Sequence, residues 1–287
     1  MADPIQDEPL PIAIRATIIM VSRNRAIELE SALDAIQLTT NRPELEVIVM
    51  DNGSTDSTTS LRDKYGEAIT FLKLPKNFGW VRAVNIALRS AQGEYVLFAD
   101  PAVRFDKDAP AKLIRILDSS PEATAAVPAL RTESGEPIAQ TRDLPEPGNL
   151  KPALRKPNTS ETALAFPSFQ AFMVRKTFLK GMNFLDQRFG DSWGDAEICF
   201  QIRNAGKKIL LVPDALATAG NGHPPLEEAS LVEADFVQGA ATYLGKHWGF
   251  LKALLYRVGC IFAALLTFKL GLFFDLINGQ KIDGTHA

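Results

Sequence analysis

The sequence predicts an α/β fold in which a mostly parallel, Rossmann-like sheet is covered by flanking helices. Two features indicate it: continuously apolar runs of the kind found in inner parallel strands, and helical segments that separate these runs over the first hundred residues. Parallel strands need crossover connections, which such helices supply. We expect strands at 16–21, 47–50, 69–72 and 95–99, and helices around 29–36, 57–65 and 80–91.

The first strand ends in a loop, Ser22-Arg23-Asn24-Arg25, that contains no glycine. A dinucleotide-binding fold would carry Gly-x-Gly-x-x-Gly at this point, because its backbone must approach a pyrophosphate closely. The loop therefore disfavours that class of protein.

The second strand ends in the most informative stretch of the chain, residues 47–56. Its apolar run stops at Asp51, and Asn52-Gly53 supplies a turn with a positive-φ position. Ligands of open α/β sheets bind at the carboxyl ends of the strands, where the Asp51 carboxylate would accept hydrogen bonds from a base or a ribose. A plain strand-to-helix turn explains the same residues, and this stretch alone does not decide between the two.

Composition excludes several classes of protein. The chain of 287 residues is 46% hydrophobic and has a formal charge of −3, which excludes global disorder and offers no basic face to nucleic acid. Cys199 and Cys260 have neither metal-motif nor disulfide-framework spacing, which suits a reducing cytosol. Residues 1–12 lack the pattern of a secretory signal and are expected to be a flexible leader.

The rest of the chain contains a long connection and then further regular elements. The polar, proline-rich stretch at 131–161 is too long for an ordinary loop and is expected to be functional or mobile. After it we expect a strand at 169–174, a helix at 195–205, a strand at 209–212 and a helical region at 226–287.

Five segments, in order, resemble the family-2 glycosyltransferases, and among these the rhamnosyltransferase-like bacterial members. The resemblance implies a GT-A fold and a nucleotide-sugar-binding, catalytic domain at 13–225. It also implies inverting transfer of a sugar from a nucleotide-diphosphate donor to a glycan or lipid-linked acceptor, typical of cell-envelope polysaccharide synthesis. The segments are 16–25, 47–56, 77–85, 95–105 and 184–209.

The resemblance places the donor at the first strand ends. It implies contacts to the base from the loop at 21–24 and from Asp51, whose carboxylate would meet the ring nitrogen edge. Asn77 and Gly79 would begin a helix beneath the donor, where small residues let the diphosphate approach. The expected donor-binding residues are Val21, Ser22, Asn24, Asp51, Asn77, Gly79, Arg82 and Asp100.

Asp195 matches the catalytic base of the family. An inverting transferase needs one carboxylate to take the proton of the attacking acceptor hydroxyl. At a helix N-terminus the Asp195 anion would be stabilised by free amides, although the same position suits a helix cap. Trp193 and Glu197 are expected on the acceptor side, Trp193 stacked on a sugar and Glu197 as an orienting or structural partner.

Asp100 falls where the family holds a divalent cation. Carboxylate and diphosphate oxygens with waters suit Mg²⁺ or Mn²⁺, which would neutralise the departing diphosphate. The pattern is incomplete, because alanine occupies the positions of a second carboxylate (Ala102) and of a histidine (Ala219). His223 would have to swing in as a ligand, and Arg82 could supply positive charge through bidentate phosphate contacts.

Residues 250–277 are far more apolar than the rest of the chain. The uncharged run between Arg257 and Lys269 is too short to span a bilayer, which takes about 20 residues. A membrane-associated helix is the first interpretation, a core or dimer helix the second, and a span the third. We therefore expect a cytoplasmic protein at the inner face of the cell membrane.

Two interpretations from other classes remain open. The first is a catalytically degenerate protein on the same fold that binds a nucleotide sugar or acts as a scaffold. The incomplete metal motif favours it, as does Gly194, which replaces the first acid of the family's Glu-Asp pair. The second is a sugar nucleotidyltransferase, disfavoured because those enzymes usually have a glycine-rich loop after the first strand.

Overall fold

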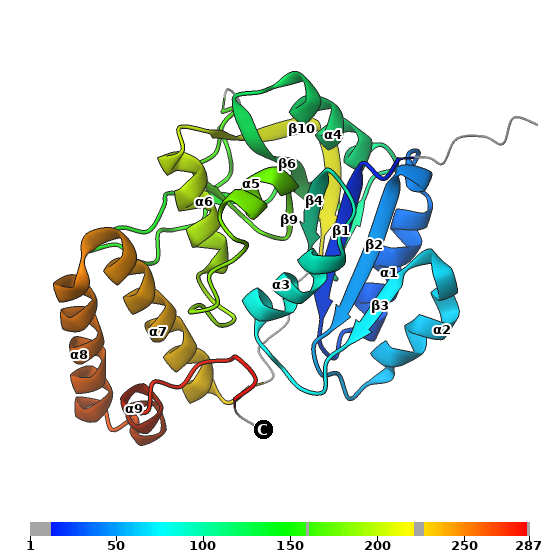
Figure 1. The fold of residues 1–287 in the computed structure, drawn as a ribbon. Helices are drawn as coiled ribbons and strands as arrows, with labels where there is room; N and C mark the ends of the chain where they lie inside the picture. Colours follow the sequence, from blue (N-terminus) through cyan, green and yellow to red (C-terminus); the bar gives the residue numbers. More distant parts are fainter. Residues whose placement is uncertain (1–12, 159–160, 221–226, 286–287) are drawn as a thin grey trace, which may run out of the picture.

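The computed structural model describes residues 13–158, 161–220 and 227–285, and these fold around an eight-stranded sheet of order β3-β2-β1-β4-β9-β6-β10-β5 (Figure 1). The strands β7 and β8 pair separately. The strands are β1 (Ala16–Ser22), β2 (Leu45–Asp51), β3 (Thr70–Lys73), β4 (Tyr95–Ala99), β5 (Val103–Phe105), β6 (Ala123–Arg131), β7 (Thr141–Arg142), β8 (Phe166–Pro167), β9 (Ala171–Arg175) and β10 (Lys208–Ala219).

The first half of the sheet is parallel, as the sequence predicts. β1 lies between β2 and β4, and all pairings among β3, β2, β1 and β4 are parallel. The register sets Ser22 beside Asp51, and Asp100 directly follows β4. The carboxyl ends of β1, β2 and β4 therefore meet at one edge, with the topological switch point between β1 and β4.

The second half of the sheet is mixed, and part of it was not predicted. β9 runs antiparallel to both β4 and β6, whereas β10 is parallel to β6. The sequence pattern indicated neither β6 nor helix α4 (Ala109–Ser119). β6 has the sequence Ala-Thr-Ala-Ala-Val-Pro-Ala-Leu-Arg and is almost completely buried. Because alanine is uncommon in strands, this sequence gives little local indication of one.

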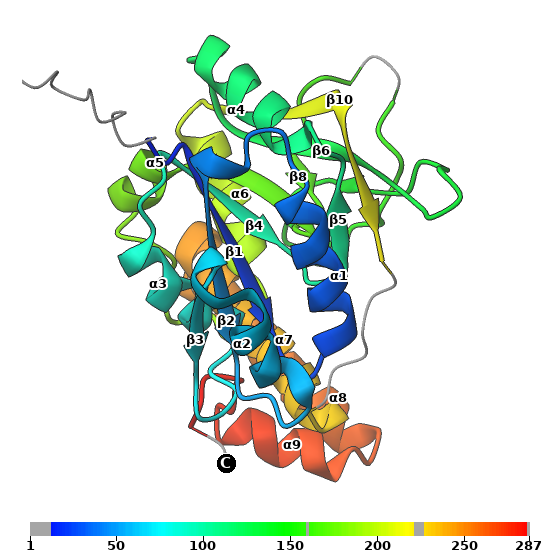
Figure 2. The ribbon, with the colours of Figure 1, turned by 90° about the vertical axis from the view of Figure 1, so that its right-hand side faces the viewer.

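Helices cover both faces of the sheet (Figure 2). The apolar sides of α1 (Ala26–Gln37) and α4 pack on one face, and those of α3 (Trp80–Ser90) and α6 (Gly194–Asn204) pack on the other. The helix expected around 57–65 is a 3-10 turn followed by α2 (Leu61–Tyr65). Helix α5 (Lys176–Gly181) follows β9.

Within residues 227–285 the chain forms α7 (Ala229–Trp248), α8 (Phe250–Leu266) and α9 (Leu270–Ile277). α7 packs against α6, and α8 and α9 pack on α7 beside the sheet domain (Figure 1). No helix among the described residues has both the length and the apolar composition needed to cross a membrane. After α9 the chain returns to the sheet domain, where Ile282 is buried.

Asp235 of α7 fastens the C-terminal region to the sheet domain. Its carboxylate is buried and accepts hydrogen bonds from the backbone amides of Ser192 at 2.9 Å, Ile282 at 3.0 Å and Asp191 at 3.3 Å. Burial raises the pKa of Asp235, and these amides oppose the shift. Gly190 leaves room for the contact, since a Cβ there would lie 2.0 Å from Asp235 Oδ1.

Asp235→Ala should destabilise the protein by about 3 kcal/mol, because buried amides lose their acceptor. Urea unfolding measures the loss, and trypsin cleavage after Lys281 should become faster as the returning segment detaches. Asp63→Ala, at an exposed position of α2, is the control and should change stability by less than about 0.5 kcal/mol. Wild-type stability and cleavage rate in Asp235→Ala would contradict the fastening role.

Candidate active site

Side chains from two loops lock the carboxyl ends of β1 and β2 together. Asn24, with φ of +50°, accepts with Oδ1 from the amides of Thr55 at 2.6 Å and Asp56 at 3.2 Å. Asp56 accepts from the amides of Ala26 at 3.1 Å and Thr58 at 2.9 Å. Burial opposes the change, but these hydrogen bonds lower the pKa of Asp56. The expected donor loop is therefore held in one conformation.

Asp51 is fully buried at the end of β2. Its Oδ1 accepts from the Ser54 amide at 2.8 Å, and its Oδ2 accepts from the Thr59 hydroxyl at 3.4 Å. The hydroxyl of Ser22, which follows Val21 at the end of β1, is also buried and has no hydrogen-bond partner within the described residues. The structure shows Asp51 shaping the turn, and its contact with a base stays a prediction.

Asn77 and Gly79 face the C-terminal region. The Asn77 side chain accepts from Asn52 Nδ2 at 2.6 Å and donates to Glu227 Oε1 at 2.7 Å. A Cβ on Gly79 would lie 2.2 Å from the carbonyl oxygen of Ile282. The space beside the Gly79 Cα is therefore taken by the segment after α9, and contact of Asn77 or Gly79 with a diphosphate stays a prediction.

Arg82 is also engaged by the C-terminal segment. Its Nη1 donates to the carbonyl oxygen of Asp283 at 2.8 Å, and its guanidinium lies 4.9 Å from the centre of the Phe78 ring. In this structure the Arg82 guanidinium is thus engaged by the C-terminal segment, and its contact with a diphosphate stays a prediction.

Asp100 forms a bidentate ion pair with Arg25. The Arg25 Nη1 and Nη2 atoms donate to its two carboxylate oxygens at 3.0 and 2.9 Å, and the Ala102 amide donates to Oδ1 at 2.8 Å. The side chains are 12% exposed for Arg25 and 32% exposed for Asp100. Because β1 and β4 are parallel neighbours, the loops that follow them meet at this pair.

The residues around Asp100 do not fit a metal ion held by protein ligands. Both carboxylate oxygens are bound to Arg25, and Ala102 supplies no side-chain ligand. Residues 13–158, 161–220 and 227–285 contain no group of three acidic, histidine or cysteine residues arranged to hold a cation. His223, the other expected ligand, lies outside the described residues. The cation beside Asp100 in the structure is a guanidinium.

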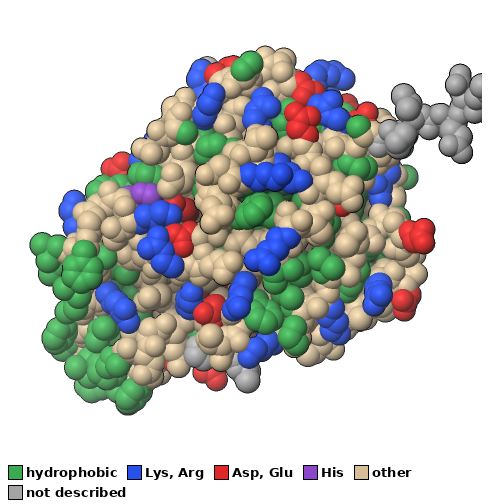
Figure 3. Space-filling view, in the orientation of Figure 1, with side chains coloured by type: hydrophobic (Ala, Val, Ile, Leu, Met, Phe, Trp, Pro, Cys, Tyr) green, Lys and Arg blue, Asp and Glu red, His purple; other side chains and the backbone are tan. Residues whose placement is uncertain are grey.

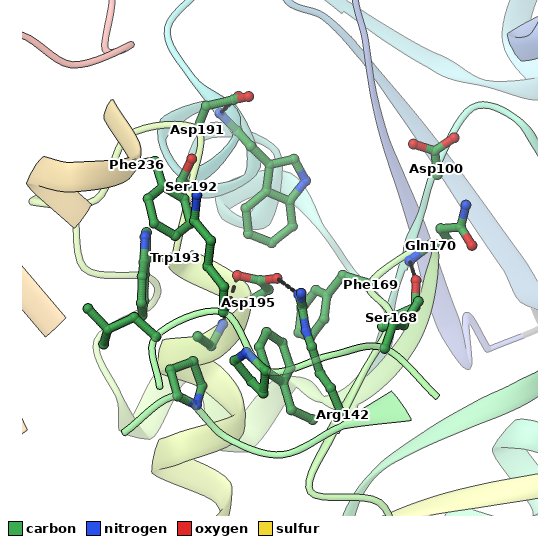
Figure 4. Close-up of a pocket in the computed structure, with 18 residues that line it drawn as sticks. Asp100, Arg142, Ser168, Phe169, Gln170, Asp191, Ser192, Trp193, Asp195 and Phe236 are labelled. Carbon is green, nitrogen blue, oxygen red and sulfur yellow. Dashed lines mark hydrogen bonds and ion pairs between the residues drawn. The ribbon is translucent and has the colours of Figure 1, made fainter. Parts of the chain in front are cut away.

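A cleft of about 540 Å³ opens beside Asp100 (Figure 4). Its walls come from the start of α3, the residues before β9, the start of α6 and the loop after β7. This loop belongs to the proline-rich stretch that we expected to be functional or mobile. The cleft brings together the carboxylates of Asp100, Asp191 and Asp195 and the cations of Arg142 and Lys151.

Asp195 enters this cleft from the first turn of α6. Its Oδ1 accepts from the Ala196 amide at 2.8 Å, and its Oδ2 lies 3.6 Å from Arg142 Nη2 (Figure 4). Burial raises the pKa of Asp195, and the Ala196 amide and the Arg142 charge oppose the shift. The helix cap is Trp193, so Asp195 is not the cap. A carboxylate with a raised pKa at a cleft wall is suited to accept a proton.

Asp191 is a second cleft carboxylate, which the sequence analysis did not single out. Its Oδ1 accepts from the Trp80 amide at 2.9 Å and thereby caps α3. Burial, and to a smaller extent the nearby Asp235 charge, raise the pKa of Asp191 to about 6. The charge of Arg23 acts in the opposite direction and lowers this pKa. A repeated Gly-Asp pair, at 190–191 and 194–195, was the available signal.

Glu197 is not among the residues that line the cleft; its contacts are those of the structural partner that was one expectation for it, and its place on the acceptor side stays a prediction. The buried carboxylate contacts Lys246 Nζ at 2.7 Å, His247 Nε2 at 2.7 Å and Gln201 Nε2 at 2.8 Å. Burial favours a higher pKa, but the hydrogen bonds outweigh it and lower the pKa of Glu197. Residues two apart on a helix face different sides, and Glu197 is a structural partner that joins α6 to α7.

Trp193 is 5% exposed and borders the cleft without offering a ring face. Its ring centroid lies 5.2 Å from that of Phe236, and a Cβ on Gly239 would lie 2.5 Å from the ring. The expected stacking of a sugar on Trp193 therefore conflicts with its packing. Trp80, Phe169 and Phe236 are the less buried aromatic residues of the cleft, and the ring centroids of Trp80 and Phe169 are 6.0 Å apart.

Arg25 and Arg142 are further site residues that the sequence analysis missed. Arg25 could have been found, because the end of the first strand must lie beside the end of a parallel neighbour. Arg142 lies in the two-residue strand β7, and no periodicity in its long polar segment indicates its contact with Asp195.

A sheet of this order, with converging loops at the carboxyl ends of its parallel strands and an acidic cleft beside them, defines a GT-A-like α/β fold. The chain belongs to glycosyltransferase family 2. The family described as "Glycosyl transferase family 2" matches residues 17–182, which is more than half of the chain and runs from β1 through α5.

Curated relatives agree with this membership. The putative teichuronic acid biosynthesis glycosyltransferase TuaG of Bacillus subtilis is 31% identical over 137 residues, which are 45% of this chain and 53% of the relative. The N-acetylglucosaminyl-diphospho-decaprenol L-rhamnosyltransferase of Mycobacterium tuberculosis is 25% identical over 229 residues, 69% of this chain and 73% of the relative. The chain covers about half of the length of TuaG and about a quarter of the length of another curated relative, the uncharacterized glycosyltransferase YfnE of Bacillus subtilis.

A solved structure shares the fold. The mannosyltransferase PcManGT from Pyrobaculum calidifontis, in complex with GDP-Man and Mn²⁺, superimposes with a TM-score of 0.57 at 19% identity. The match covers 95% of this chain and 89% of that structure. A protein of this fold therefore binds a nucleotide sugar together with a divalent cation.

Removing the charge of Arg142 should raise the pKa of Asp195 further, because that charge favours the carboxylate. A carboxyl ¹³C NMR titration of wild type and Arg142→Gln measures the shift. Arg104→Gln is the matched control, since Arg104 pairs with Glu133 outside the cleft and its loss should leave the Asp195 titration unchanged. An equal or lower Asp195 pKa in Arg142→Gln would show that the guanidinium does not act on this carboxylate.

Proposed function

We propose that the protein is an inverting glycosyltransferase that moves a sugar from a nucleotide-diphosphate donor to a glycan or lipid-linked acceptor. One observation carries the proposal: Asp195, with its raised pKa, lines a cleft that begins at Asp100, on the carboxyl edge of the parallel strands. Membership of family 2 supports donor binding at that edge.

In the proposed reaction, an acceptor hydroxyl attacks the anomeric carbon of the donor from the side of Asp195. The glycosidic bond forms as the bond between that carbon and the diphosphate oxygen breaks, and the nucleoside diphosphate leaves with the electron pair. Asp195 takes the proton of the hydroxyl. Attack opposite the leaving group inverts the configuration. The raised pKa strengthens Asp195 as a base, and Arg142 keeps it ionised.

Arg25 is proposed to face the charge that develops on the departing diphosphate. Asp100 orients the guanidinium by its bidentate contact, and arginine binds phosphate without an intervening metal ion. The competing arrangement is Mg²⁺ or Mn²⁺ held by Asp100 and the diphosphate. The Mn²⁺ complex of PcManGT supports it by analogy, and it requires Asp100 to leave Arg25.

The acceptor is proposed to lie under the loop at 142–154, against Trp80 and Phe169. Lys151 and Arg142 place positive charge in this part of the cleft, which suits an acceptor that carries an anionic group. The mycobacterial relative is named for a sugar linked through diphosphate to decaprenol, which supports a lipid-linked acceptor and a role in cell-envelope synthesis.

Asp195→Asn should lower the rate of transfer by about 10²- to 10⁴-fold, the usual contribution of a general base, and leave nucleotide affinity within about twofold. Release of nucleoside diphosphate from a panel of uridine, guanosine and thymidine diphosphate sugars measures turnover, and calorimetry measures binding. Asp63→Asn is the control. Unchanged turnover in Asp195→Asn would remove this residue from the role. Tight binding without turnover by wild type would instead support the catalytically degenerate scaffold.

Arg25→Gln should weaken nucleoside diphosphate binding by about 10- to 100-fold, whereas Arg25→Lys should retain part of it. Calorimetric titration of wild type with UDP and with GDP, in EDTA and then in MnCl₂, should give the same affinity in both media. Arg104→Gln again serves as the control. Mn²⁺-dependent binding that Arg25→Gln leaves intact would establish the metal arrangement in place of this one.

A further inference from the structure

The outer surface of α8 and α9 is apolar and exposed. In α8, Leu251, Leu255 and Phe262 are 65%, 63% and 60% exposed, although helices of a water-facing surface normally turn polar side chains outward. Only Ala264 of α8 is buried. Hydrophobic side chains gather over these two helices at the lower left of Figure 3. The exposed large apolar residues are Phe250, Leu251, Leu254, Leu255, Val258, Phe262, Leu265, Leu266, Phe268, Leu270, Phe274 and Ile277.

These residues form one continuous face. The stripe on α8 runs through 251, 254–255, 258, 262 and 265–266, the spacing of one helical side over about 25 Å. The opposite side of α8, through Tyr256, Cys260 and Ala264, packs toward α7 and α9. The apolar stripe is therefore left over after the helix has made its contacts within the protein.

The face continues around the turn into α9. Phe268, in the turn, has φ of +55° and is 86% exposed, and Leu270, Phe274 and Ile277 carry the stripe along α9. Arg257 Nη2 donates to the Leu276 carbonyl oxygen at 3.0 Å and holds the two helices together. The exposed aromatic side chain of Phe268 therefore lies at the bend between the two helices.

Charge on this region is positive. Residues 249–278 contain Lys252, Arg257 and Lys269 against a single acid, Asp275, a net charge of +2 in a chain of −3. Lys269 is 54% exposed but forms an ion pair with Glu233 at 2.9 Å, and Arg257 is partly buried and bound to the Leu276 carbonyl oxygen, so the exposed Lys252 is the base most accessible to a headgroup. Basic groups beside an inserted apolar face complement anionic lipid headgroups.

We propose that the α8–α9 face docks on an anionic lipid bilayer, with both helices lying in the plane of the interface. The side chains of the stripe are hydrocarbon and can form no hydrogen bonds. A protein–protein interface, in contrast, usually has a polar rim and several direct hydrogen bonds, so the stripe fits a lipid layer better than a protein partner. The projecting Phe268 fits a fluid acyl layer better than a second folded copy. Spanning is not required, since no described helix suits it. The docking does not depend on transferase activity.

Flotation with phosphatidylcholine–phosphatidylglycerol vesicles tests the proposal on the full chain. Wild type should float with these vesicles and bind pure phosphatidylcholine about tenfold more weakly. Leu255→Glu/Phe262→Glu should weaken binding by at least about tenfold, since two charges enter the apolar layer. Ile27→Glu/Leu38→Glu adds the same charges at exposed apolar positions of α1 and its end, and should bind like wild type. Lys252→Glu should weaken binding to the anionic vesicles only.

Two results would overturn the proposal: wild type that stays with the lipid-free fraction, or a Leu255→Glu/Phe262→Glu variant that binds like wild type. The alternative is that a second copy of the chain covers this face. Sedimentation velocity without lipid would then show a wild-type dimer and a monomeric Leu255→Glu/Phe262→Glu variant. Nucleoside diphosphate release without vesicles should be the same in the variant and wild type, because both changed residues are exposed and neither lines the cleft. Loss of docking and loss of the proposed chemistry are therefore separate outcomes.

Discussion

The parallel alignment of β2, β1 and β4 is the constraint on which the site depends. Strands that run in one direction in register end at one edge, so the loops that follow them converge. This alignment brings Arg25 to Asp100 across 75 positions of sequence and sets Ser22 beside Asp51. The loops are then locked to each other by Asn24, so the edge is preorganised before any ligand arrives.

The arginine partners of Asp100 and Asp195 give the two carboxylates different capacities. The Nη1 and Nη2 atoms of Arg25 each donate to one carboxylate oxygen of Asp100 within hydrogen-bond distance, so both oxygens are occupied. Asp195 lies 3.6 Å from Arg142, beyond a hydrogen bond, so the guanidinium biases its charge without occupying the oxygen. Asp100 is therefore suited to orient the Arg25 guanidinium, and Asp195 is suited to accept a proton.

The sequence predicts the parallel half of the fold because its inner strands β1, β2 and β4 are buried on both faces and are therefore almost continuously apolar, whereas the edge strand β3 is partly exposed. It also predicts the helix that carries Asp195, because Ile198 and Ile202 recur at helical spacing, whereas the role of Asp195 is implied only by the family resemblance. The antiparallel insertion of β9 depends on long-range pairing, and the alanine-rich β6 carries little local preference. The partners of Gly79, Arg82 and Trp193 come from beyond residue 235, and no local pattern encodes contacts so far apart.

The C-terminal region is both an outer surface and a wall of the cleft. α7 presents Phe236 to the cleft, while its neighbour Asp235 holds the amides of Asp191 and Ser192, shortly before Asp195. The same helix packs Ala234 and Val237 against α8 and α9. A surface bound through α8 and α9 is thus linked by one helix to the backbone that positions the base. Because α7 makes both sets of contacts, docking would hold the cleft at a set height and orientation above the lipid, where an acceptor on a lipid carrier would present its sugar.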